Sequence, residues 1–233
     1  MYHTGRLAVT EHGQLTTYLD KLRIYEAAEP ASWMKEILHF GGGANASEQA
    51  SITNFLNSVE EIISDTLFGG NVHTFLKTTS AAVTTTNADS INNLINNGVS
   101  IMTFYGHGSS SNFDHEIEAP SFYNNEGKYP FIIGNSCYVG AIHSTTFTLS
   151  DSWIKSPKGA IGFLSSMDQG NLLYLSTYSR ELYRNFAYKL YGQPVGKQIS
   201  NTLGNILNDV WSMYVEISSY QITLHGDPAV VIN

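Results

Sequence analysis

Short runs of apolar residues, most of them stopping at glycine or serine, alternate along this chain with longer segments in which apolar residues recur every three or four positions. The runs span residues 36–40, 71–76, 99–105, 129–133 and 159–164. Short apolar runs bounded by turn residues are typical of buried strands. We therefore predict a strand at each run, a further short strand at residues 7–9, and a turn at Gly226-Asp227-Pro228 before a last apolar run.

The segments between the runs have the period of amphipathic helices. Helices are expected between Thr10 and Pro30, at residues 47–68, before Gly98, at residues 148–155 and 172–191, and after Pro194. Strands alternate with helices at least four times, which predicts an α/β fold with a largely parallel sheet covered on both faces. Residues 109–128 have no periodicity and predict a long loop, and long loops in compact domains are usually functional.

Two of the runs are followed by a reactive side chain. Residues 99–105 lead into Gly106, His107 and Gly108, and residues 129–133 lead to Cys137, the only cysteine. In an open α/β sheet, ligands bind outside the carboxyl ends of the strands. If the two strands are neighbours, an imidazole and a thiol meet there, as a cysteine nucleophile and its base require. A lone cysteine is more often a core residue, so this interpretation depends on the position of Cys137 after a strand.

The composition excludes several classes of function. The chain has 233 residues, 42% of them hydrophobic, and a formal net charge of −8. These values suit one domain with a sizeable core. Because lysine and arginine are nowhere clustered, neither nucleic acid nor an anionic membrane surface is an expected partner. No apolar run approaches the ~18 residues of a membrane-spanning helix, and a single cysteine excludes an internal disulfide.

The polar residues favour an exported protein. Charged residues make up 14% of the chain, which is below the roughly 25% of an average soluble protein, so much of the surface consists of Asn, Ser, Thr and Tyr. Residues 1–6 contain no apolar region of a signal peptide. Either the protein stays inside the cell, or the chain is a segment of a longer exported protein. We favour the second explanation.

The residues around His107 and Cys137 resemble the catalytic core of the gingipain-type cysteine peptidases, the C25 group with a caspase-like fold. The resemblance rests on residues 105–109, Tyr-Gly-His-Gly-Ser, and residues 130–140, Pro-Phe-Ile-Ile-Gly-Asn-Ser-Cys-Tyr-Val-Gly. Flanking segments resemble the family in the same order along the chain. These segments are residues 4–7 with Tyr25-Glu26, residues 158–163 and residues 224–229.

The resemblance implies a single domain over residues 1–233, built as a caspase-like three-layer α-β-α sandwich with a mostly parallel central sheet. It implies an endopeptidase of protein or peptide substrates that is extracellular or attached to the cell surface of a Gram-negative, Bacteroidetes-type bacterium. Family members usually belong to a larger multidomain chain, and this chain is expected to lack the first strands of their domain. No cofactor is required, and a structural calcium ion is compatible with the resemblance.

In the mechanism that the resemblance implies, Cys137 is the nucleophile and His107 is the base, while the backbone N–H groups of Gly108 and Cys137 form the oxyanion hole. Family members of known mechanism carry an acid just after the strand that here ends at Phe40. Residues 41–45 are Gly-Gly-Gly-Ala-Asn instead, so we expect no acid there to orient the histidine, and the nearby Glu48 is not clearly equivalent. Three hypotheses stay open: an active endopeptidase with a Cys-His dyad, a sorting transpeptidase of a secretion system, and an inactive relative that serves as a binding module.

Substrate-binding residues are expected where the strands on either side of the crevice end. They are Asn135, Ser165, Ser166, Met167 and Asp168. With the loop after Phe40, residues 165–168 are expected to form the pocket for the substrate residue before the scissile bond. Because a buried unpaired carboxylate is costly, Asp168 is expected to face solvent, and the pocket to prefer small or uncharged side chains.

A dense group of polar residues lies in the long loop. The group consists of Asp114, His115, Glu116 and Glu118. Acid and histidine side chains at this spacing can bind a metal, but a solvated loop is the preferred interpretation. His143 follows Cys137 by six residues and is a weaker candidate for a second base.

Overall fold

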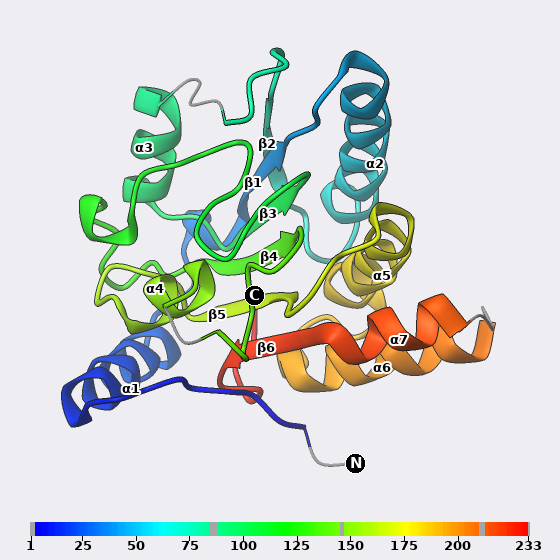
Figure 1. Cartoon of the computed structure of the whole chain (residues 1–233). Helices are drawn as coiled ribbons and strands as arrows, with labels where there is room; N and C mark the ends of the chain where they lie inside the picture. Colours follow the sequence, from blue (N-terminus) through cyan, green and yellow to red (C-terminus); the bar gives the residue numbers. More distant parts are fainter. Residues whose placement is uncertain (1–2, 84–87, 145–146, 210–212, 233) are drawn as a thin grey trace.

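A six-stranded sheet forms the centre of the computed structural model, which describes residues 3–83, 88–144, 147–209 and 213–232 (Figure 1). The order of the strands is β2-β1-β3-β4-β5-β6. Their bounds are β1 Glu36–Gly41, β2 Asn71–Leu76, β3 Ile101–Tyr105, β4 Phe131–Asn135, β5 Gly162–Ser166 and β6 Ile222–Gly226. The five apolar runs of the sequence thus form the strands β1 to β5, which lie side by side in the sheet.

These five strands pair in parallel, and β6 adds an antiparallel edge next to β5. The predicted strand at residues 7–9 is wrong: only Arg6 pairs there, in an isolated bridge with His225 of β6. The antiparallel strand was not predicted either, since the helix before it, α7 (Met213–Gln221), leads directly into β6 without a loop.

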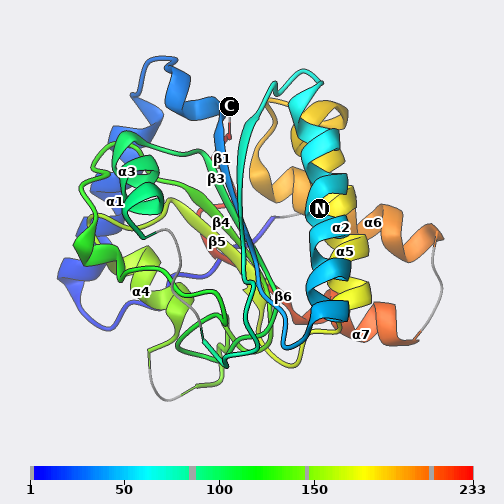
Figure 2. The same ribbon diagram turned by 90° about the horizontal axis from the view of Figure 1, so that it is seen from above.

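Helices cover both faces of the sheet, so the molecule has three layers (Figure 2). On one face lie α1 (His12–Glu26), α3 (Ala88–Asn97) and α4 (Leu149–Lys155), and on the other lie α2 (Ala46–Ser64), α5 (Leu172–Arg184), α6 (Val195–Asp209) and α7. Each face has its own apolar core. The predicted three-layer α/β fold with a mostly parallel central sheet is confirmed. None of the helices in the described ranges combines the length and apolar character that crossing a membrane requires.

Local sequence explains where the helices nearest the carboxyl edge of the sheet begin. The Asn45 side chain accepts a hydrogen bond from the Glu48 N–H, which caps the start of α2. In the same way, the Asn171 side chain accepts from the Tyr174 N–H at the start of α5. Both caps lie just after a strand-end loop, so they fix the point at which the chain leaves the carboxyl edge of the sheet.

Candidate active site

His107 and Cys137 follow neighbouring strands. In the parallel register of β3 and β4, Tyr105 pairs with Asn135, so each of the two reactive residues lies two positions beyond the same rung. Neighbouring strands are about 4.8 Å apart, and both side chains therefore emerge at one edge of the sheet, where α/β proteins bind ligands. The His107 side chain is 51% exposed, and Cys137 is partly buried.

An acid contacts the histidine, although residues 41–45 contain none. Glu48 Oε1 lies 2.9 Å from His107 Nε2. The acid comes from the first turn of α2, because β1 continues to Gly41 and the chain then turns over the edge of the sheet into this helix. The absence of an acid at residues 41–45 therefore does not leave the imidazole without a carboxylate partner.

The Glu48 carboxylate is held in its charged form. Its other oxygen, Oε2, accepts a hydrogen bond of 2.7 Å from the Ala44 N–H. Partial burial raises the pKa of Glu48, but the Ala44 hydrogen bond and the contact with His107 outweigh it and bring the pKa below its ordinary value. A carboxylate that stays ionised can orient the ring and stabilise an imidazolium.

The loop of Cys137 is clamped against the loop that follows β5. The Tyr138 N–H donates to the Asp168 carbonyl and the Gly140 N–H donates to the Ser166 carbonyl, both at 3.0 Å. The Cys137 thiol lies 3.7 Å from the Gly170 carbonyl oxygen. Tyr138 adopts a left-handed conformation with φ of 60°, which is uncommon for a residue other than glycine and clusters at functional sites.

Two backbone N–H groups next to the reactive residues are available as donors. Within the described residues, the N–H groups of Gly108 and Cys137 make no hydrogen bond. A Cβ at Gly108 would overlap the Ser136 hydroxyl, so a larger residue there would displace the Ser136 side chain. These positions are consistent with the oxyanion hole that the motif predicts.

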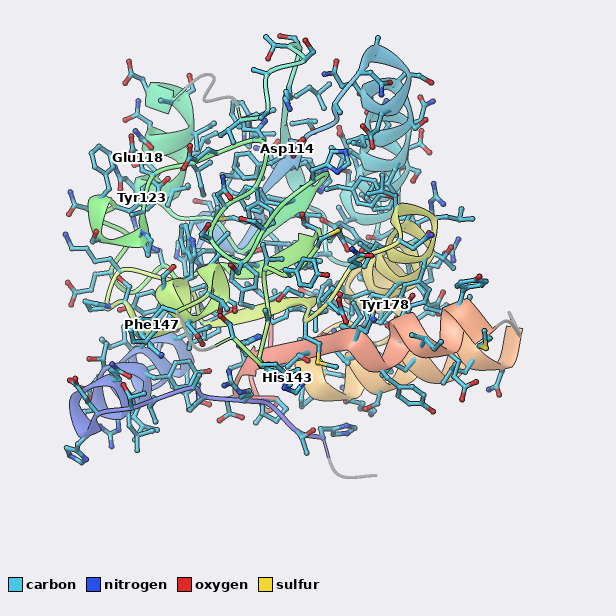
Figure 3. The ribbon with its side chains drawn as sticks, in the orientation of Figure 1. Asp114, Glu118, Tyr123, His143, Phe147 and Tyr178 are labelled. Carbon is cyan, nitrogen blue, oxygen red and sulfur yellow. The ribbon has the colours of Figure 1, made fainter. Side chains whose placement is uncertain are left out.

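An open cavity of about 510 Å³ lies next to this edge. Gly108, Tyr138, His143, Met167 and Asp168 are among its lining residues, and His143 is seen there below the sheet edge (Figure 3). Asp168 is exposed, as predicted, and its Oδ1 accepts a hydrogen bond from the Gln169 N–H.

Three of the expected pocket residues lie elsewhere. Asn135 is 3% exposed, and its side-chain oxygen accepts a hydrogen bond from Ser179 of α5. Ser165 is buried beneath Gly140, and the Ser166 hydroxyl donates to the Asp168 carbonyl. Their burial argues against the expected substrate contact of Asn135 and the expected pocket role of Ser165 and Ser166, because side chains within a strand point alternately into the two helix layers and not over the edge of the sheet.

The polar group of the long loop is not a solvated patch. Asp114 and His115 are buried, whereas Glu116 and Glu118 are exposed. Figure 3 shows Asp114 over the sheet, apart from Glu118 beside α3. Asp114 pairs instead with the buried Lys77 at 3.4 Å. Across the described ranges, no three His, Cys, Asp or Glu side chains are grouped as a metal site.

Sequence reasoning missed Lys77, and it named Glu48 only as a nearby acid that is not clearly equivalent to the acid of the family. Lys77 directly follows β2, so the rule that strand ends carry functional side chains could have found it. Glu48 carries no such signal, since a glutamate at the third position of a helix is also what an ordinary N-terminal cap contains.

Comparisons with known proteins give a consistent result. The sequence matches the family model of peptidase family C25 over residues 1–233. The structure is similar to the crystal structure of the Arg specific cysteine proteinase gingipain R, with a TM-score of 0.81 and 16% identity over 99% of this chain. It is also similar to the complex of Porphyromonas gingivalis RgpB pro- and mature domains, with a TM-score of 0.78 and 16% identity over 99% of this chain.

A more distant likeness extends to the Saccharomyces cerevisiae separase-securin complex, with a TM-score of 0.54 and 11% identity over 90% of this chain. The chain spans 55% of the gingipain R chain, 56% of the chain in the RgpB complex and 13% of the separase chain. No curated protein matches the sequence. At these identities the structural likeness establishes the fold.

Proposed function

The chain belongs to peptidase family C25, a family of cysteine peptidases, and from that premise we propose that it is an endopeptidase in which Cys137 and His107 form the catalytic dyad. The observation that carries the proposal is the pairing of Tyr105 with Asn135, which brings the two residues to one edge of the sheet. Glu48, 2.9 Å from the His107 ring, is proposed as the acid that completes the site.

The reaction proceeds through a thioester. His107 takes the proton of the Cys137 thiol, and the thiolate attacks the carbonyl carbon of the scissile bond. The N–H groups of Gly108 and Cys137 donate to the resulting oxyanion, each contributing on the order of 3 kcal/mol. His107 then gives its proton to the departing amine. In the second half, His107 takes a proton from water, the hydroxide attacks the thioester, and the proton returns to the thiolate as the acid product leaves.

The cavity that Met167 and Asp168 line is proposed to receive the substrate residue before the scissile bond. Apart from Asp168 and His143, the lining consists of one glycine, three serines, one tyrosine, one alanine and Met167, which supports a preference for small or uncharged side chains. We further propose that the protein acts outside the cell or on the surface of a Bacteroidetes-type bacterium, as part of a longer chain. The chemistry needs no cofactor, and a calcium ion would serve only a structural role.

Digestion of a peptide library, read by mass spectrometry, tests this proposal. We expect cleavage products from the wild type and none from Cys137→Ala, whose melting temperature stays within a few degrees of the wild type. His107→Ala should slow hydrolysis by about 10²–10⁴-fold. An unreactive wild type that iodoacetamide does not alkylate at Cys137 would overturn the peptidase assignment, and products joined to an added amine would indicate a transpeptidase.

A further inference from the structure

Two loops at the active edge are joined by a closed ring of contacts. The first, residues 42–48, comprises the loop from β1 to α2 and the first turn of α2, and the second, residues 106–114, follows β3. Glu48 contacts the His107 ring at 2.9 Å and accepts from the Ala44 N–H. One residue earlier, the Gly43 N–H donates to Asp114 Oδ2 at 2.8 Å. The Asp114 N–H donates to the His107 carbonyl at 3.0 Å, which closes the ring of contacts at His107.

The loops meet so closely that only glycine fits between them. A Cβ on Gly42 would overlap the Asp114 carboxylate, and a Cβ on Gly106 would lie 2.6 Å from Asp114 Oδ1. The Gly42 N–H also donates to the Tyr105 carbonyl at 2.9 Å. The glycines after Phe40 thus make room for a carboxylate that arrives from the other loop.

The Asp114 side chain is buried together with its counter-ion. Lys77 Nζ lies 3.4 Å from Asp114 Oδ2, and the two side chains are 2% and 6% exposed. Lys77 itself is fixed in place because its backbone N–H donates to the Gly41 carbonyl at 2.8 Å. Buried charges persist only when they are paired and hydrogen-bonded, so the carboxylate has little freedom to leave the Gly43 N–H.

We propose that Asp114, supported by Lys77, is a positioning residue that holds the loop of His107 against the segment that carries Glu48, so that the imidazole keeps its contact with Glu48. The inference rests on the proposed function of Cys137 and His107. Asp114 touches neither substrate nor thiol and acts through the backbone at both ends of the ring. Loss of its acceptor releases the Gly43 N–H, and a displacement of about 1 Å at a catalytic group can cost about 10²-fold in rate.

Two double variants test the proposal, because both remove the buried charges and only one of them leaves a side-chain oxygen that can accept from the Gly43 N–H. Asp114→Asn with Lys77→Met keeps a side-chain oxygen at that place, whereas Asp114→Ala with Lys77→Met does not. We expect kcat to fall by about 10- to 100-fold in the alanine variant, with KM within about twofold of the wild type, and to be rescued in the asparagine variant. Assays at least 20 °C below each melting temperature, with Lys21→Met as a control at a buried lysine that, among the described residues, bonds only to carbonyls near the end of α4, separate this effect from loss of stability.

A second measurement needs no turnover. In the Cys137→Ala background, the ring signals of His107 in NMR spectra should shift or broaden in the alanine double variant and match the wild type in the asparagine double variant. Equal kcat and equal His107 signals in the two double variants would overturn the role of Asp114, whatever the activity of the wild type. An inactive wild type with the expected His107 signals would overturn the peptidase function and leave the positioning role supported.

Discussion

Removing the charge of Glu48 without changing its shape should slow catalysis measurably. In the proposed mechanism an imidazolium forms at His107 as the thiolate attacks, so the carboxylate would stabilise the transition state more than the neutral resting ring. At the observed 2.9 Å, Coulomb's law gives about 1.4 kcal/mol in water and about 3 kcal/mol at an effective dielectric constant of 40. The half-exposed His107 side chain lies between these environments. Because each 1.36 kcal/mol corresponds to tenfold in rate, we expect Glu48→Gln to lower kcat by about 10- to 100-fold.

Steady-state hydrolysis of a fluorogenic peptide, chosen from the library digest, measures this effect. Glu61→Gln is the matched control, since Glu61 lies on the exposed side of the same helix and its loss should leave kcat within about twofold of the wild type. The rate at which iodoacetamide alkylates Cys137 should fall in Glu48→Gln as well. A Glu48→Gln enzyme with the kcat of the wild type would refute the reasoning and return the site to a simple Cys-His dyad.

Three further predictions follow from other contacts. Lys21 donates to three carbonyls near the end of α4, so Lys21→Met should lower the free energy of unfolding by about 1–3 kcal/mol. A urea titration measures this, and Lys197→Met, at an exposed lysine, should leave the free energy of unfolding almost unchanged. Burial lowers the pKa of His39 from 6.5 to about 3, so the unfolded chain binds the extra proton below pH 6.5 and stability falls with falling pH. Between pH 7 and pH 5 this amounts to about 2 kcal/mol, and a His39→Gln variant with an unchanged pH dependence would contradict it. Cleavage confined to bonds after Arg or Lys, and lost in Asp168→Asn, would overturn the preference for uncharged side chains in the library digest.

The parts of the molecule that the sequence predicted well are those set by local pattern. Apolar runs ending in glycine define β1, β3 and β4, and the alternation of strands with helices requires parallel pairing. The position of His107 opposite Cys137 follows from these two rules and from the rule that ligands bind at strand ends. Motifs on neighbouring strands were therefore enough to predict that His107 and Cys137 lie at one edge of the sheet.

The side chains that sequence could not assign are those whose role depends on tertiary contacts. Asn135 looks like a pocket residue because it is polar and near the cysteine, yet its amide oxygen bonds to Ser179 in the core. Glu48 and Asp114 lie 59 and 7 residues from His107 in the sequence, and only the packing of α2 over the sheet edge brings all three together. Hydrophobic periodicity says which face of an element is buried, but it does not say which polar group another element will bring there.

The rung between Tyr105 and Asn135 also affects how such a chain can diverge. The separation of the two reactive residues depends on strand register and not on the length of residues 119–128, the part of the long loop beyond Asp114 and His115. Doubling the length of a flexible loop costs only about 0.6 kcal/mol, so an insertion at an exposed position such as Glu126 should cost little. A one-residue slip of β4 would instead turn every side chain of the strand to the opposite face. Exposed loop residues can therefore change in sequence and number while the register of β3 and β4 keeps His107 and Cys137 at the same separation.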